Sequence, residues 1–173
     1  MAGKAGKTAK KRSRTVPILG AVLAVLAVIM TIVLCLPQGN TAEFTPPPFE
    51  ESAVSGVPEV PEALGYSSPY REGMAYRFSV CGNVTPEGSS AVVYLTNPAE
   101  NEVWLKLRLL DESGRTLGET GLLRPGEYVR CVTLSSVPSA GAKITLKIMG
   151  YEPETYHSAG SVTLSTTMGG AVQ

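Results

Sequence analysis

The sequence has few of the residues that most catalytic and metal sites use. Of its 173 residues only one is histidine, His157, and three are cysteine. Acid–base triads and most zinc sites draw on histidine, so a single copy argues against both classes of site. No nucleophile with a matching base stands out elsewhere in the chain. We therefore expect a protein that is not an enzyme and that carries no cofactor or metal.

Acidic residues are missing from the first part of the chain. The first acid is Glu43, and all fifteen acidic residues follow the apolar run at 16–36. Six of the fifteen basic residues precede that run and the other nine follow it, so the two parts carry formal charges of +6 and −6. Nucleic-acid binding needs a concentrated basic face, and the acidic larger part argues against that partner.

The run at 16–36, VPILGAVLAVLAVIMTIVLCL, contains no charged residue. At about 1.5 Å per residue, a helix of this length crosses a hydrocarbon core of roughly 30 Å, so it predicts one transmembrane helix in contact with membrane lipid. The basic tail at 1–15 places the N-terminus in the cytoplasm and the rest outside the cell membrane. A cleaved secretory signal is the alternative, although its apolar region is usually only about 7–15 residues long.

Residues 37–72 are rich in proline and glutamate. The segment contains Pro46, Pro47 and Pro48 in succession, four further prolines and only one basic residue. Proline removes backbone donors and like charges repel, so this composition predicts an extended, disordered stalk.

Residues 73–168 alternate apolar and polar side chains and are interrupted every ten residues or so by turn residues, which is typical of an all-β sandwich. In the clearest run Leu105, Leu107 and Leu109 alternate with Trp104 and Lys106, so one face is expected in the core and the other in solvent. The domain is predicted to hold seven antiparallel strands and to be followed by a flexible tail at 169–173. The seven runs are 74–80, 91–96, 103–109, 115–119, 128–134, 143–149 and 161–166.

Cys81 and Cys131 both lie in this domain, fifty residues apart. In an oxidising compartment a bridge across such a loop would contribute roughly 4 kcal/mol. The alternative is two separate cysteines that behave as small buried hydrophobes. Both interpretations stay open at the level of sequence.

Three elements are candidates for partner contact: the loop at 151–157, the turn from Asn97 to Asn101, and an open sheet edge. Trp104 either packs as part of the core or serves as an exposed aromatic anchor. The candidate contact residues are Trp104, Tyr151, Glu152, Glu154, Tyr156 and His157.

The stretch from Val93 to Leu134 contains an asparagine turn, an alternating strand, a D-x-x-G hairpin and an L-x-P-G-E turn before another strand. It resembles the extracellular immunoglobulin-like or fibronectin-III-like domains of bacterial surface proteins, and the likeness extends over roughly 74–167. The whole arrangement is similar to small single-pass envelope proteins. This resemblance implies an immunoglobulin-like sandwich acting as an accessory or scaffolding module that contacts another envelope protein. The alternatives are a carbohydrate or wall-polymer binder and a membrane-tethered regulatory subunit of an enzyme.

Overall fold

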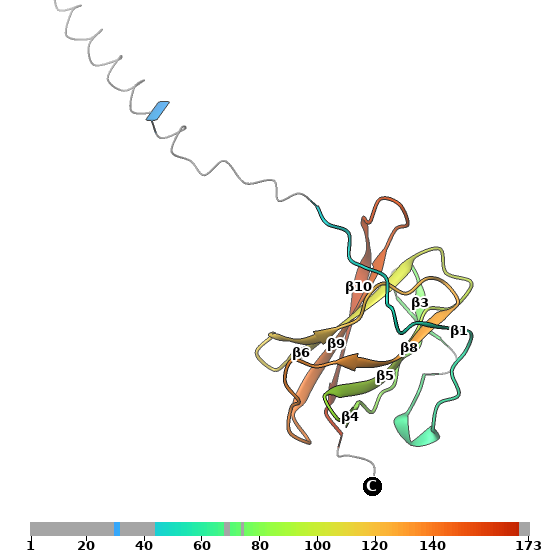
Figure 1. Ribbon diagram of the computed structural model, residues 1–173, viewed down its shortest axis with the longest axis vertical. Helices are drawn as coiled ribbons and strands as arrows, with labels where there is room; N and C mark the ends of the chain where they lie inside the picture. Colours follow the sequence, from blue (N-terminus) through green and yellow to red (C-terminus); the bar gives the residue numbers. More distant parts are fainter. Residues whose placement is uncertain (1–29, 32–43, 68–69, 74, 170–173) are drawn as a thin grey trace, which may run out of the picture. The chain divides into compact units, whose positions relative to one another are not determined.

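The computed structural model describes residues 30–31, 44–67, 70–73 and 75–169 (Figure 1). The chain divides into two compact units, Met1–Phe44 and Thr45–Gln173. The predicted basic tail at 1–15 lies outside the described residues, and so does the predicted span at 16–36 except for Met30 and Thr31, which are helical. Among the residues that are described, no helix combines the length and the hydropathy that crossing a membrane requires.

The unit that begins at Thr45 is all-β, as predicted, and its sheets are antiparallel. Within the described residues, one four-stranded sheet has the order β1 (Val54–Ser55), β8 (Glu127–Thr133), β5 (Ser90–Thr96) and β4 (Thr85–Glu87). The second has the order β10 (Ser158–Thr167), β9 (Lys143–Tyr151), β6 (Trp104–Asp111) and β7 (Thr116–Glu119). A small hairpin pairs β2 (Arg71–Glu72) with β3 (Arg77–Phe78), and one short 3-10 helix, η1, covers Glu62–Leu64. Each of the seven predicted runs overlaps one of these strands.

The core lies between the two four-stranded sheets, because alternate side chains of their strands face one another. On β6, Leu105, Leu107 and Leu109 have no exposed surface, which confirms the predicted alternation. Burial of each such side chain is favourable by roughly 1.5–3 kcal/mol. The core cluster draws on both layers, through the buried residues Val93, Leu95, Val129 and Val132 of the first sheet and Leu105, Leu107, Leu109, Ile144, Leu146 and Ile148 of the second.

The opposite face of β6 is less solvated than the alternation predicts. The side chain of Lys106 is only 8% exposed, and its Nζ donates a hydrogen bond of 2.7 Å to Oε1 of Glu119 on β7. Arg108 forms a second ion pair with the same carboxylate, at 2.8 Å. A buried ammonium group needs such a partner. The alternation correctly placed Lys106 on the face opposite the leucines, but its prediction that this face lies in solvent is wrong for Lys106.

The segment predicted as an extended stalk packs on the sheets from Pro48 onward. The carbonyl of Pro48 accepts a hydrogen bond from Leu122 N–H, and Glu50 N–H donates to the Leu122 carbonyl, both at 2.9 Å. Ala53 then reaches the core, and β1 pairs with β8 in the other sheet. The segment therefore crosses from the second sheet to the first, and the compact unit starts well before residue 73, where the sequence places it.

Gly121 allows this crossing. A Cβ atom on Gly121 would lie 2.5 Å from the Glu50 backbone nitrogen, closer than real Cβ contacts, so only glycine fits under the passing chain. Its N–H also donates a 2.7 Å hydrogen bond to Oε2 of Glu50. A few apolar residues hold the segment in place, among them Phe49 and Leu64. The proline-rich composition around them predicted a disordered stalk, so these contacts were not predicted.

Candidate functional site

Trp104 lies at the start of β6 among aromatic side chains from distant parts of the sequence. Its ring centroid is 4.9 Å from that of Phe49, with an edge-to-face angle of 78°, and 5.2 Å from that of Tyr156, with an angle of 58°. On the neighbouring strand Tyr151 is its register partner. All four side chains are partly buried. We call Phe49, Trp104 and Tyr156 the aromatic cluster.

Arg124 covers the side of the cluster formed by Phe49. Its guanidinium carbon lies 3.7 Å from the centroid of the Phe49 ring, a cation–π contact. Glu127 holds Arg124 in place, since Oε2 of Glu127 accepts a 2.7 Å hydrogen bond from the Arg124 backbone N–H and Oε1 lies 3.5 Å from Nη1. The cluster thus combines aromatic rings and a guanidinium, the side chains that are enriched at protein interfaces.

Tyr156 reaches the cluster from a strained loop between β9 and β10. Tyr156 has a φ of 56° and Glu154 a φ of 65°, both in the left-handed region that non-glycine residues seldom occupy. The loop is closed by hydrogen bonds from Glu152 N–H to the His157 carbonyl at 2.8 Å and from Tyr156 N–H to the Glu152 carbonyl at 3.0 Å. Such strain costs about 1–3 kcal/mol per residue and persists only where the surrounding structure holds it.

The charged members of the predicted contact set lie on the outside of the same loop. Glu152, Glu154 and His157 are exposed, and Nδ1 of His157 lies 3.9 Å from Oε2 of Glu152. The structure therefore gathers Trp104 and Tyr156 into one surface, and the acidic and histidine side chains form its rim. Sequence reasoning missed Phe49 and Arg124, whose only signal was an isolated aromatic residue in a proline-rich segment and an arginine in a turn.

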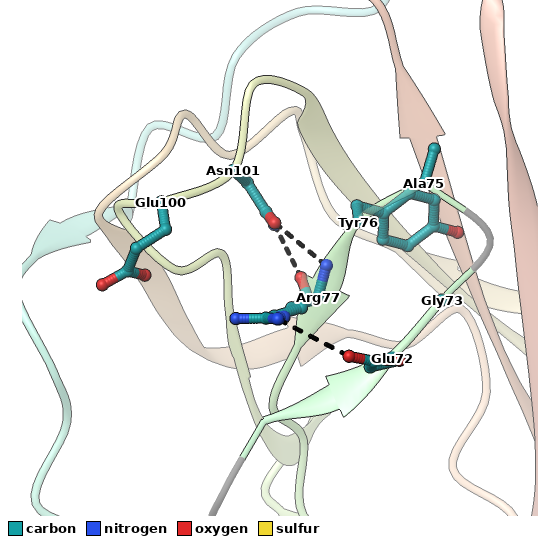
Figure 2. Close-up of a pocket in the computed structure, with 7 residues that line it drawn as sticks. All are labelled: Glu72, Gly73, Ala75, Tyr76, Arg77, Glu100 and Asn101. Carbon is teal, nitrogen blue, oxygen red and sulfur yellow. Dashed lines mark hydrogen bonds and ion pairs between the residues drawn. The ribbon is translucent and has the colours of Figure 1, made fainter.

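The turn from Asn97 to Asn101, the second predicted contact element, forms a joint whose first residues, Asn97 and Pro98, are buried, whereas Ala99 and Glu100 are exposed. Asn97 is fully buried, and its Nδ2 donates to the carbonyls of Val103 and Leu123, each at 2.9 Å. Its Oδ1 accepts a 2.7 Å hydrogen bond from Nδ2 of Asn101. Asn101 in turn bonds both the N–H and the carbonyl of Arg77, which fixes β3 to the turn (Figure 2). These two amides hold the end of the domain that carries the aromatic cluster.

A shallow pocket of about 300 Å³ lies beside this joint (Figure 2). Tyr76 forms its inner wall, and its hydroxyl donates to the carbonyls of Ile148 and Gly160 at 3.0 and 3.2 Å. Arg77 lies 3.6 Å from Glu72 at the rim. Arg77 and Glu72 are paired with one another, and the lining offers no nucleophile next to a base. The lining residues are Glu72, Gly73, Ala75, Tyr76, Arg77, Glu100 and Asn101.

Cys81 and Cys131 are free thiols, so the structure does not contain the candidate bridge between them. Cys131 on β8 is the register partner of Val92 on β5, and Cys81 N–H bonds the Val93 carbonyl from the other side of β5. One strand therefore separates them, which places their Cα atoms about 9–10 Å apart, beyond the roughly 7 Å that a disulfide spans.

Burial disfavours the charged thiolate form of both cysteines. It raises the pKa of Cys81 to about 12 and also raises the pKa of Cys131, so neither is an activated thiolate. Cys81 packs with Leu64 and Val92 beneath η1, and the partly buried Cys131 lies against the same small cluster. This arrangement agrees with the second sequence interpretation, two small apolar side chains.

Among residues 44–67, 70–73 and 75–169, no group of three or more histidine, cysteine, aspartate or glutamate side chains is placed to hold a metal ion. No protein-family model matches the chain, and a search of curated proteins finds no match.

Proposed function

We propose that this protein is a non-catalytic interaction module, anchored in the cell membrane by residues 16–36 and displayed outside the cell, that binds another envelope protein through the aromatic cluster. Its domain belongs in this proposal to the immunoglobulin-like sandwiches, which the two antiparallel layers support. The apolar run and its basic flank support the anchor. The proposal extends to an accessory or scaffolding role in an envelope assembly.

The aromatic cluster is the observation that carries the proposal. Three partly buried rings from Phe49, β6 and the 151–157 loop meet at one place, and the two nearest pairs are 4.9 and 5.2 Å apart. The rings are inclined to one another, so they present an uneven apolar surface with Arg124 at its margin. Interface residues whose truncation costs about 2 kcal/mol or more are enriched in tryptophan, tyrosine and arginine.

The backbone strain in the loop supports the same assignment. A loop that served only to connect two strands would be less strained with glycine or asparagine at this position, because both residues tolerate a positive φ better than tyrosine does. Here the strained conformation brings the Tyr156 ring against Trp104. The loop is therefore built to present a side chain, which is the arrangement expected of a contact surface on a rigid scaffold.

Site-specific photocrosslinking in intact cells tests the proposal. A photoreactive phenylalanine analogue replaces Tyr156 in the full chain, and a matched control carries it at Ser113, which is exposed in the turn between β6 and β7. We expect a discrete protein adduct from position 156 alone. Trp104→Ala should weaken its formation about thirtyfold, equivalent to about 2 kcal/mol. Equal adducts from both positions, or an adduct unaffected by Trp104→Ala, would contradict the proposal.

A wall-polymer binder is the second candidate. It is favoured by one observation, the presence of Trp104, Tyr151 and Tyr156 on neighbouring positions of one surface. The two functions differ in the nature of the adduct formed at position 156. Exhaustive protease digestion of the purified adduct that leaves a peptide of a second protein joined to position 156 supports the protein partner. A glycan remnant at position 156 that a wall hydrolase trims, together with Trp104-dependent binding to purified wall polymer, supports the polymer.

The membrane topology has its own test. Protease added to intact cells should remove the β domain and leave a short membrane fragment that retains residues 1–36. A domain that resists protease in intact cells but is digested after lysis would contradict display outside the cell, and a mature chain beginning beyond Leu36 would contradict the anchor.

A further inference from the structure

Strand β10 is the long uncovered edge of the domain. It is the outermost strand of its sheet and pairs only with β9. The other three edge strands, β1, β4 and β7, have two to four residues each, against ten for β10. Residues 48–50 lie alongside Leu122 on the β7 side of the second sheet and cover part of that edge. The described residues place no strand against the outer side of β10.

The ends of β10 are tied to the rest of the domain, and its middle is not. Near its start the Gly160 carbonyl accepts the hydroxyl of Tyr76, and near its end the hydroxyl of Thr166 donates to the Gly82 carbonyl at 2.8 Å. Between these points, on an edge strand, alternate backbone N–H and C=O groups point away from β9. The run from Ser161 to Ser165 therefore offers a rigid template for one more strand.

The sequence of β10 lacks the usual protection of an edge. SAGSVTLSTT contains no charged residue and no proline, whereas exposed edges commonly carry lysine, proline or an inward charge. The bulge between Ser158 and Gly160 is confined to its first residues. Val162 and Leu164 face the core but are only partly buried, because no neighbouring strand covers their outer side. The edge protection that lysine and arginine give elsewhere in the domain does not extend to this strand.

We propose that β10 binds β10 of a second copy of this chain in antiparallel fashion, which joins the two second sheets into one continuous sheet. This inference goes beyond the partner contact proposed for the aromatic cluster and uses a different surface. With a twofold axis at Thr163, Val162 of one copy lies opposite Leu164 of the other, and each covers the uncovered side of its counterpart. On the outer face, Ser161 lies opposite Ser165 and Thr163 opposite its own equivalent, pairs of the kind that stabilise sheets.

Charge favours a second copy as the occupant. The nearest charged side chain along the sheet is Lys147, the register partner of Thr163 on β9. Across the proposed interface the two copies of Lys147 are three strand spacings apart, about 14 Å, which exceeds the screening length of about 8 Å at physiological salt. Two uncharged, hydroxyl-lined edges therefore meet without burying a charge. The chain's own segment at 46–48 is unsuitable, because three successive prolines donate no backbone hydrogen bond.

Cysteine crosslinking of the full chain in membranes tests the proposal directly. Thr163→Cys is compared with Thr145→Cys, a substitution of the same residue type one strand inward on β9. Directly opposed residues of antiparallel strands have Cα atoms about 4.5–5.5 Å apart, within disulfide range. The control positions are three strand spacings apart and offset by four residues along the strands, because Thr145 pairs with Ser165, which makes about 20 Å. We expect mild oxidation to give a disulfide-linked homodimer from the first variant and none from the second.

A charge substitution supplies the second test. In detergent the full chain should form a dimer whose dissociation constant rises about tenfold or more in Thr163→Lys, because the substitution brings two ammonium groups together, and stays unchanged in Thr145→Lys. A dimer indifferent to Thr163→Lys, a monomeric parent chain, or equal crosslinking at both cysteine positions would overturn the proposal. A mixed disulfide of Thr163→Cys with a different protein, without homodimer, would also overturn it and identify another occupant. None of these results bears on the aromatic cluster, whose crosslinks are read at position 156.

Discussion

The buried amide of Asn97 offers a quantitative test of how this domain is held together. Asn97→Ala removes three side-chain hydrogen bonds, but its consequences for the three partners differ. The Leu123 carbonyl still accepts the N–H of Leu105 at 3.0 Å, and Nδ2 of Asn101 still donates to the Arg77 carbonyl at 2.6 Å. The Val103 carbonyl is the group that depends on Asn97 for its side-chain donor.

The expected cost follows from this difference. An orphaned buried carbonyl costs about 1–3 kcal/mol, and each of the two bonds whose partner keeps another contact costs about 0.5–1.5 kcal/mol. Together with a small cavity, these terms predict a loss of about 2–6 kcal/mol in the free energy of unfolding. For a domain of this size that is a large share of the total, which is typically about 5–15 kcal/mol.

The assay is equilibrium denaturation of the full chain in mild detergent, followed by the fluorescence of Trp104, the only tryptophan in the sequence. Asn101→Ala is the comparison variant. Its bonds to Arg77 lie near the surface, where water replaces them, but it also removes the 2.7 Å donor to the buried Oδ1 of Asn97, so a loss of about 1–3 kcal/mol is expected, smaller than for Asn97→Ala. An Asn97→Ala variant that loses no more stability than Asn101→Ala would refute the reasoning that burial makes this amide important.

Three further predictions concern other parts of the domain. Gly121→Ala should lower the free energy of unfolding by about 1–3 kcal/mol and should increase protease cleavage of the segment at 45–50, since the added methyl group displaces that backbone. Glu119→Gln should cost about 1–2 kcal/mol at neutral pH, because it weakens the pairing of the buried Lys106 while leaving the half-exposed carboxamide in contact with water. Partial burial opposes ionisation of Glu119, but hydrogen bonds from its basic neighbours hold its pKa below the usual value. Its contribution to the stability of the fold is therefore present above about pH 4.5 and is lost as the pH falls through the folded-state pKa. The free energy of unfolding of the variant should depend less on pH in this acid range. Site-resolved thiol labelling should modify Cys131 in the folded protein and Cys81 only after unfolding, and a non-reducing digest that yields a Cys81 to Cys131 peptide would contradict the free-thiol assignment.

Period-two alternation was enough to predict the longer strands but neither the short strands β1, β2 and β4 nor the boundary of the domain. The spacing of Leu105, Leu107 and Leu109 predicts a buried strand because it matches the pleat, and all three side chains are completely buried in the structure. The segment before residue 73 has no period, since its contacts are single apolar residues and backbone hydrogen bonds such as those of Pro48 and Glu50 to Leu122. Contacts of that kind cannot be predicted from composition alone, because each depends on where a distant turn lies.

The candidate site was predictable in part for the same reason. Tyr156 and Trp104 could be assigned to a loop and a strand, but not to neighbouring positions, because β9 and β6 are not consecutive in the chain and their pairing is known only from the structure. Phe49 could not be assigned, since it reaches Trp104 only through the crossing over Gly121. The candidate bridge between Cys81 and Cys131 is absent because strand β5 lies between the two cysteines. The sequence alone does not show that this strand separates them.

The two proposed surfaces are compatible because they occupy different parts of the domain. The aromatic cluster is at the end of the domain where β9 passes into β10, whereas the β10 edge runs along the side of the sheet toward the opposite end. In an antiparallel pair of β10 strands the two chains run in opposite directions, so the two clusters lie at opposite ends of the joined sheet. At about 3.3 Å per residue, the ten residues of β10 would separate those ends by roughly 30 Å. Neither cluster then covers the other, and a dimer would hold two envelope proteins at a fixed spacing. Trp104→Ala should accordingly weaken the partner crosslinks about thirtyfold without changing the Thr163→Cys homodimer, and loss of both together would show that the two surfaces are not independent.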